Sequence, residues 1–528
     1  MKEKTRNFLF WFVLIQPFLD FNFFYHKPLS TVLPFTIPTI LRIIGVLIIL
    51  LAFMANKDAW RRFSKQYWLI AYLVILIVYC ILHLWHMQNF NSINPSNYNY
   101  STFGEVFYLF RMVLPLMLIY FTNYLDMPKR QFGIAMEGMS GIFSGVIVIT
   151  NLFAISLKSY EHGVISGNIF TWFMGKGFTP LYGYSHSASK GYFYFTNTTS
   201  AILLMLAPLV FYYLFSHFNL KTCLVSVLHF LAMLEIGTKV ALYGLLGSMI
   251  LSLFVWLFHC LALRNETFSW KPLLTMAILF ALFGVTYRVT PAVQRYNYEI
   301  YWAKSHDADI SKENAELKTG LNKYKNDKEG LADFEKQFLA KNYQKYALNK
   351  RFITKSYPYQ YDPQFWINML SKPATYRLAN RNVEEAMLDQ VVKYNNNPLD
   401  KWMGIGYMRE THIFNLERDF TAQKYSLGII GMILYLGFYV GIILYGVYEW
   451  LRYKGVRTYL ISSMLMASVF ILGASFMSGN VMDFPTANLL LGFLDGSLLL
   501  YIREGKRKTS NKKTFEQITR ANGIIYGE

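Results

Sequence analysis

Charged residues are scarce in this sequence. Asp, Glu, Lys and Arg make up 16% of its 528 residues, whereas 54% are hydrophobic and 18% are aromatic. Soluble globular domains usually carry about 25% charged residues. Hydrophobic runs of about 20 residues, long enough to cross ~30 Å of hydrocarbon, recur along the chain. The composition therefore excludes a soluble enzyme, a disordered chain and a fibrous protein, and it predicts an all-α polytopic membrane protein.

Cysteine is also rare, and the 3 cysteines show no CxxC spacing. We therefore expect neither a disulfide framework nor a zinc site. The sequence lacks a GxxxxGK[ST] phosphate loop and a GxSxG elbow, which disfavours nucleotide-driven transport by this chain. Asp307 and Asp309 match a D-x-D pattern, but their charged helical context favours a solvated helix face. We expect no cofactor and no bound metal.

The net charge of +19 would suggest nucleic-acid binding in a soluble protein. In a membrane protein the same excess is typical of cytoplasmic loops, which are enriched in Lys and Arg. We therefore expect membrane lipid, and no nucleic acid, around these charges.

Twelve hydrophobic runs predict about 12 transmembrane helices. The expected spans are 7–25, 37–55, 67–87, 104–123, 132–156, 191–216, 222–236, 240–262, 272–289, 425–449, 457–478 and 484–502. With this count the basic loops all fall on one side, whereas the loops 88–103 and 479–483 contain no Lys or Arg. The positive-inside rule makes the basic side the cytoplasm, so both termini are expected there.

This topology leaves a loop of 135 residues, 290–424, outside the membrane. Within it, the alternating Lys and Glu of 311–351 predict a surface helix or a helical hairpin. The sequence Asn382-Val-Glu-Glu385 resembles a capping box that opens a second helix, with Met387 and Val391 on one face. The Pro, Tyr and Trp cluster at 357–373 predicts a loop. The expected organisation is a nine-span membrane region (1–289), the loop domain (290–424), a three-span membrane region (425–502) and a basic cytoplasmic tail (503–528).

Ionisable residues inside spans are costly and seldom idle. Asp20 and Arg42 both lie near the outer ends of their expected spans, where they can pair.

A second set of charges gathers at the outer membrane surface. Its cations suit a lipid-linked diphosphate, whose charge lies in the headgroup layer, and its carboxylates or histidine can serve as a general base. The alternative is that these residues only anchor helix ends. The set consists of Lys239, Arg288, Arg295, Glu417, Arg418, Asp419 and His412.

Four motifs, in this order, resemble the O-antigen ligase/polymerase-like family of bacterial membrane proteins. The first is GYFYFTNTTSAILL, with Asn197, and the second is IGTKVALYGLL, with Lys239 where the family usually has Arg. The third, YRLANRNVEEAMLDQ…WMGIGY, includes Arg381 and the turn Gly404-Ile-Gly406. The fourth is LERDFTAQKYSLGIIG. The resemblance covers roughly 190–500, and a twelve-span plan with one large, partly helical outer loop agrees with it.

The resemblance implies a GT-C-like membrane glycosyltransferase in the bacterial cell membrane. Such an enzyme takes an oligosaccharide from a polyprenyl diphosphate at the outer face and transfers it with inversion and without a metal. We expect it to polymerise, or to ligate, repeat units of a surface polysaccharide such as a capsule or exopolysaccharide. Its expected partners are the lipid-linked oligosaccharide and the flippase and chain-length regulator of the same pathway.

The resemblance also implies site residues, with two departures. Family ligases carry a His about twelve residues before the GxxG of the post-loop span, whereas counting back eleven residues from Gly428 reaches Glu417 here. We therefore expect Glu417 to be the general base, with Asp419 or His412 as alternatives. Lys239 supplies a point charge where Arg supplies a fork. The expected diphosphate ligands are Lys239, Arg288, Arg295, Arg381, Arg418 and Asn197, with Lys239, Arg288 and Arg381 converging around the diphosphate.

Two other functions fit the same sequence. A lipid-linked oligosaccharide flippase or exporter would line a continuous cavity with charge, whereas the charges here favour the outer interface. A non-catalytic scaffold of a polysaccharide assembly machine fits the composition equally well.

The topology predicts which sites an impermeant reagent can reach in intact cells. With native cysteines removed, a single cysteine at Asn326 should be labelled and one at Thr509 should not. Lysed cells provide the control in which both react. Equal labelling of the two sites in intact cells would contradict the twelve-span arrangement.

Overall fold

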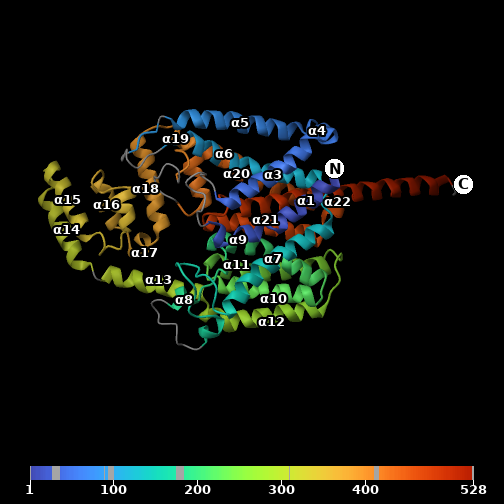
Figure 1. Ribbon diagram of the computed structural model, residues 1–528, viewed down its shortest axis with the longest axis horizontal. Helices are drawn as coiled ribbons and strands as arrows, with labels where there is room; N and C mark the ends of the chain where they lie inside the picture. Colours follow the sequence, from blue (N-terminus) through green and yellow to red (C-terminus); the bar gives the residue numbers. More distant parts are fainter. Residues whose placement is uncertain are drawn as a thin grey trace. The chain divides into compact units, whose positions relative to one another are not determined.

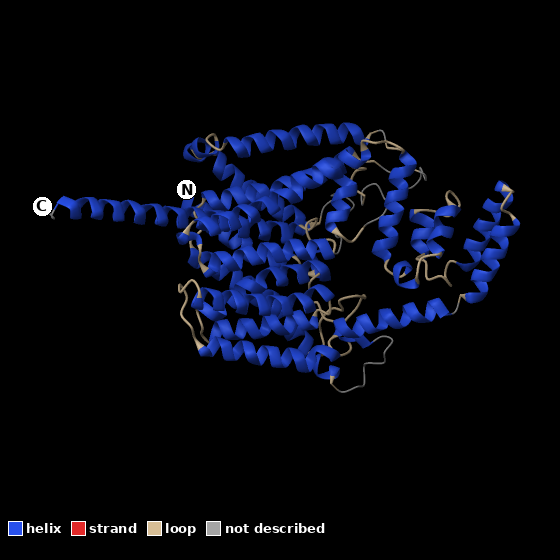
Figure 2. Cartoon of the chain, turned by 180° about the vertical axis from the view of Figure 1, so that it is seen from behind, coloured by secondary structure: helices blue, strands red, loops and turns tan. Residues whose placement is uncertain are grey.

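A computed structural model describes residues 2–25, 36–88, 90–92, 100–173, 183–308, 310–408 and 416–525. Figure 2 shows helices joined by loops, and across these residues extended pairing is limited to three isolated β-bridges. The chain divides into two compact units, the first formed by 1–67, 111–294 and 437–528, the second by 68–110 and 295–436. Because the second unit combines the outer loop with 68–110, the expected domain limits at 290 and 425 stay predictions.

Figure 1 shows the helices in sequence colours, and they coincide with most of the hydrophobic runs. The first unit contains α1 (Lys2–Leu14), α2 (Gln16–Leu19), η1 (Asn22–Tyr25), α3 (Ile37–Met54), α4 (Lys57–Phe63), α7 (Lys129–Leu152), η3 (Ile169–Trp172), α8 (Gly183–Ser187), α9 (Thr196–Ser216), α10 (Leu220–Glu235), α11 (Lys239–Leu261), α12 (Trp270–Thr286), η4 (Tyr287–Val289), η6 (Lys454–Val456), α21 (Tyr459–Met477) and α22 (Pro485–Ile525). The second unit contains α5 (Tyr67–Met87), α14 (Ser311–Lys323), α15 (Lys328–Asn342), the π-helix η5 (Phe352–Ser356), α16 (Pro363–Leu370), α17 (Ala374–Arg377), α18 (Asn380–Asn395) and α19 (Asp400–Met403). Three further helices are divided between the units, namely α6 (Thr102–Tyr124), α13 (Pro291–Ala308) and α20 (Asp419–Arg452), and the first residue of α5, Tyr67, also belongs to the first unit.

Ten helices in the described part of the chain are long and apolar enough to cross a membrane, which confirms a polytopic all-α protein. Two of the twelve expected spans differ. The expected span 7–25 is divided into α1, α2 and η1, because Pro17 lacks the N–H that would continue the first helix. The expected span 222–236 is α10, which has 16 residues and ends before Gly237, whose φ is +75°. The count of twelve and the orientation stay predictions.

Helix α9 is central to the first unit. It is apolar on all sides, and 89% of its apolar window is buried, as expected for a helix surrounded by other helices. Its neighbours include α7, α10, α11 and α21. The beginning of α9, where Asn197 lies, is therefore held by packing along the whole helix.

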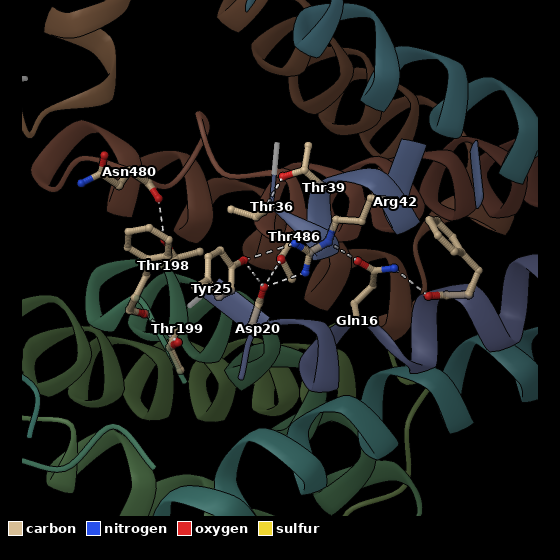
Figure 3. Close-up of polar contacts among 12 residues, drawn as sticks. Gln16, Asp20, Tyr25, Thr36, Thr39, Arg42, Thr198, Thr199, Asn480 and Thr486 are labelled. Atoms are coloured by element: carbon tan, nitrogen blue, oxygen red, sulfur yellow. Dashed lines mark hydrogen bonds and ion pairs between the residues drawn. The ribbon is translucent and has the colours of Figure 1, made fainter. Parts of the chain in front are cut away.

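A buried polar cluster joins the beginning of the chain to α3 and α22 (Figure 3). Arg42 Nη2 lies 2.6 Å from Asp20 Oδ1, and this oxygen also accepts a hydrogen bond of 2.7 Å from Thr486 Oγ1. Arg42 Nε donates to Gln16 Oε1 over 2.8 Å, and Arg42 Nη1 donates to the Tyr25 hydroxyl. The exposed fractions of Asp20 and Arg42 are 4% and 1%. The pairing expected from the sequence is confirmed, and each charge is neutralised by a fixed set of partners.

The long loop region 290–424 forms much of the second unit and has its own hydrophobic core. Fully buried residues from several helices, among them Trp366, Met387 and Leu339, pack together with Met87 at the end of α5. The expected helical hairpin is confirmed, because α14 and α15 lie side by side (Figure 1). Residues 295–308 and 310–408 therefore form a folded, mainly helical structure rather than a connector.

Two local expectations for this loop are wrong. The helix expected to open with a capping box at Asn382 is α18, which begins at Asn380 after the N-cap Ala379 and has no side-chain cap. The Asn382 oxygen instead accepts a hydrogen bond from Arg418. The stretch expected to be a loop contains α16, whose N-cap Asp362 accepts from the Phe365 amide, with Pro363 at the favoured first position. Met387 and Val391 are buried on one helix face, as expected.

The expected basic tail is helical. Helix α22 continues through it as far as Ile525. Arg503 lies 2.6 Å from Asp126, and Lys506 lies 2.9 Å from Glu449, so two of its first cations are paired within the first unit.

The Asp20–Arg42 pair provides a stability test. Asp20→Ala leaves a buried guanidinium without its counter-charge and should lower the free energy of unfolding by about 3–5 kcal/mol. The matched control is Glu316→Ala, which removes an ion pair with Lys341 at a half-exposed site and should cost less than about 1 kcal/mol. Denaturant unfolding in detergent measures both. Equal losses in the two variants would show that burial of the Asp20–Arg42 pair contributes nothing.

Candidate active site

Two segments of the second unit bring together several of the expected site residues. One is the first turn of α18 and the other is the segment Leu416–Arg418, which leads into α20. Arg381 Nη2 lies 3.2 Å from Glu417 Oε2. Side-chain exposures are 33% for Arg381 and 46% for Glu417, so a bound molecule can reach both groups. A cation and a carboxylate therefore face each other where solvent has access.

A second pair of contacts lies beside the first. Arg418 Nη1 lies 3.4 Å from Glu385 Oε2, and Arg418 Nη2 donates to Asn382 Oδ1 over 3.2 Å. Because Arg381, Asn382 and Glu385 lie within about one turn of α18, this helix contacts both Glu417 and Arg418. The result is a pair of half-exposed arginines, each held by an acid of the other segment.

Glu384 lies on the same helix as Arg381 and Glu385 and is buried. Its carboxylate accepts a hydrogen bond from the Glu417 backbone N–H. Burial, and then the negative charge of Glu417, raise the pKa of Glu384 to about 8, against the opposing effect of Arg381 and Arg351. At neutral pH Glu384 therefore keeps its proton.

The first half of α20 is held by side chains from two other helices. Tyr425 donates its hydroxyl hydrogen to Asp389 of α18, and Tyr108 of α6 donates to Gln423 Oε1 over 2.9 Å. Asp419, the first residue of α20, is buried. Glu417 is therefore more accessible to an acceptor molecule than Asp419.

Helix α20 is broken at Gly428, where φ is +70° and ψ is 179°. The break frees backbone carbonyls, and the turn Gly404-Ile-Gly406 supplies their donors. Ile405 N–H donates to the Tyr425 carbonyl over 2.8 Å and Gly406 N–H to the Ser426 carbonyl over 3.1 Å. A Cβ on Gly404 would lie 2.3 Å from the Ser426 oxygen, so only glycine fits. The two glycine motifs of the sequence thus meet at one place.

The other expected ligands lie elsewhere in the fold. Arg295 pairs with Glu299 of its own helix at 2.9 Å. Lys239 is the exposed first residue of α11, and Arg288 is exposed in η4. Asn197 lies in the first turn of α9 and is half-buried. These last three belong to the first unit and Arg381 to the second, so convergence of Lys239, Arg288 and Arg381 around one diphosphate stays a prediction.

His412 and Asp309 lie outside the described residues. In the part of the chain that is described, no group of three or more His, Cys, Asp and Glu side chains is arranged to hold a metal ion.

Sequence reasoning missed Glu384 and a buried histidine, His83, which bonds to Glu105. Glu384 follows Arg381 by three residues, and on a helix that spacing indicates a shared face. His83 and His86 have the same spacing within an apolar span, which was a detectable signal of a polar contact made by that span.

Comparison with protein families gives one result that spans both units. A family model described as O-antigen ligase like membrane protein matches residues 2–505. No curated protein matches the chain. The matched range contains α18, the glycine turn and α20.

The pKa of Glu384 predicts a pH-dependent stability. Because its folded-state pKa of about 8 exceeds the ordinary carboxyl value, the folded state binds this proton more tightly. The free energy of unfolding should therefore fall between roughly pH 4.5 and 8, by on the order of a few kcal/mol. Glu384→Gln should remove that component, whereas Glu316→Gln, at a half-exposed site, should keep it. Denaturant titrations at several pH values measure the difference, and identical slopes for wild type and Glu384→Gln would contradict it.

Proposed function

The chain belongs to the O-antigen ligase like membrane protein family, and we propose that it polymerises lipid-linked oligosaccharide repeat units into a bacterial surface polysaccharide. The donor is a polyprenyl-diphosphate-linked glycan at the outer face of the cell membrane, and the acceptor is a hydroxyl of another repeat unit. The observation that carries the proposal is the half-exposed Arg381–Glu417 pair.

The pair supplies both functions that the reaction needs. An inverting transfer requires cations for the departing diphosphate and one base for the acceptor proton. Arg381 and Arg418 are suited to the first role, because guanidinium forks match phosphate oxygens. Glu417 is suited to the second, because a single carboxylate suffices when the acceptor oxygen attacks directly.

Donor binding and base activation are coupled in this scheme. In the free protein Arg381 is paired with Glu417. When a diphosphate takes the Arg381 guanidinium, the Glu417 carboxylate is released to accept a proton. The acceptor oxygen then bonds to the anomeric carbon, the bond to the diphosphate breaks, and the proton passes to Glu417. The polyprenyl diphosphate leaves with its charge on the arginines, and no step requires a metal.

The rival functions differ in covalent outcome. A ligase would transfer the glycan to a different acceptor, whereas a flippase would move the lipid-linked oligosaccharide without forming a bond. Glu417, at the offset where family ligases have His, favours the polymerase. Incubation of the purified protein with lipid-linked repeat units separates them, because only a polymerase yields longer lipid-linked glycans together with free polyprenyl diphosphate.

Substitutions at the pair test the two roles separately. Glu417→Gln keeps the shape and a hydrogen-bond acceptor for Arg381 but removes basicity, so polymer formation should fall by roughly 10²-fold or more with donor binding preserved. Arg381→Ala should weaken donor use by roughly 10- to 100-fold.

Glu316→Gln is the control, because Glu316 pairs only with Lys341 in the α14–α15 hairpin among its contacts in the described structure. Long polymer at near wild-type rate from Glu417→Gln would make Glu417 structural and would move the search to Asp419 and His412.

A further inference from the structure

Helix α5 carries two buried histidines one turn apart, and each faces a carboxylate of the second unit. His83 Nε2 lies 2.8 Å from Glu105 Oε1, and His86 Nε2 lies 2.9 Å from Asp400 Oδ1. His83 and Glu105 are 0% and 1% exposed. Neither pair belongs to the proposed reaction, so their polar atoms require another explanation.

Every polar atom of the His83–Glu105 pair is used. His83 Nδ1 lies 2.6 Å from the Met403 carbonyl, and because a carbonyl only accepts, Nδ1 must carry a proton. The second carboxylate oxygen of Glu105 accepts the Tyr407 backbone N–H over 2.7 Å. The pair therefore binds the segment 403–407 at both ends. All of its polar atoms are engaged in these hydrogen bonds and are not offered to a substrate.

The gripped segment is the glycine turn that completes α20. Between Met403 and Tyr407, the amides of Ile405 and Gly406 donate to the carbonyls freed by the break at Gly428. Residues before that break carry the α20 contacts to α18, and they follow directly after Glu417 and Arg418. Hydrogen bonds thus connect the His83–Glu105 pair, through the turn, to the chain segment of the proposed site.

The His86–Asp400 pair holds the residues just before the same segment. The Asp400 backbone carbonyl accepts the Gly404 N–H over 2.8 Å. The second carboxylate oxygen of the Asp400 side chain accepts a hydrogen bond from Asn395, at the end of α18. Both histidines of α5 therefore fasten the chain immediately around Gly404.

We propose that His83 and Glu105 are positioning residues: by fixing the turn 403–407 they hold the first half of the broken helix α20, and with it Glu417, in the geometry that transfer requires. This inference rests on the proposed function. The positioning role requires the hydrogen bonds of the pair and not its charge. A proton relay would require a titratable group, so substitutions can distinguish the two roles.

Two substitutions of Glu105 distinguish a positioning role from a charge-dependent role. In Glu105→Gln a neutral His83 ring with its proton on Nδ1 can accept the amide N–H at Nε2, and the amide oxygen can still accept the Tyr407 N–H. Glu105→Leu and His83→Leu remove these bonds. The control is His229→Leu, which removes another fully buried imidazole, bonded to Ser140 over 2.9 Å in the first unit.

The first measurement does not depend on activity. Hydrogen exchange of the full-length protein in detergent should show the amides of Ile405, Gly406 and Tyr407 exchanging roughly 10-fold or more faster in Glu105→Leu and His83→Leu, because their opening requires loss of fewer bonds. Glu105→Gln and His229→Leu should match wild type there. Unchanged exchange in both leucine variants, or fast exchange in Glu105→Gln, would overturn the proposal.

The second measurement is polymerisation of lipid-linked repeat units. The leucine variants should lower kcat by roughly 10-fold or more with a smaller rise in the donor KM, because the donor ligand Arg381 lies on α18 whereas Arg418 lies beside Glu417. Glu105→Gln should restore kcat. A loss in Glu105→Gln equal to that in Glu105→Leu would overturn positioning in favour of a charge-dependent role. If the wild-type protein makes no polymer while hydrogen exchange at the turn responds as expected, the proposed function is wrong. The conclusion that His83 and Glu105 fix the turn is then still supported.

Discussion

Backbone carbonyls need hydrogen-bond donors wherever water is excluded, and this requirement governs the second unit. A helix normally satisfies it internally. Helix α20 does not, because the chain turns at Gly428 and leaves the carbonyls of Tyr425 and Ser426 without helical donors. Two amides of the turn 404–406 replace them. The close approach needs glycine on both sides, which explains why WMGIGY and SLGIIG occur together in one sequence.

Charges serve two different purposes in the two units. Asp20 and Arg42 are fully buried, share several partners and cannot exchange them without exposing a bare charge. Arg381 and Glu417 are half-exposed and meet through one ion pair of 3.2 Å, which is worth little in water and is easily replaced. A strong, fixed pair suits assembly of the first unit, and a weak pair suits a site where a phosphate must displace a carboxylate.

Much of the fold could be predicted from the sequence, because long apolar runs and helical charge spacing are local signals. They identified most spans, the α14–α15 hairpin and the Asp20–Arg42 pair. They failed where a single residue overrides a run, as Pro17 does, and where a cap competes with a tertiary contact, as at Asn382. The family resemblance brought Arg381 and Glu417 into one hypothesis. Glu384 and His83 depend on burial by distant segments, which one sequence does not display.

Helix α22 has a mechanical consequence. Its 41 residues extend about 60 Å, twice the ~30 Å thickness of the hydrocarbon layer. A flexible chain could spread its cations over anionic headgroups, whereas α22 holds Arg503 and Lys506 at fixed places on a helix. Electrostatic attraction falls off within a Debye length of about 8 Å, and Arg503 and Lys506 are already neutralised by Asp126 and Glu449. Helix α22 is thus about twice as long as one crossing of the hydrocarbon layer requires, and the first two cations after Tyr501 are held by acids of the first unit.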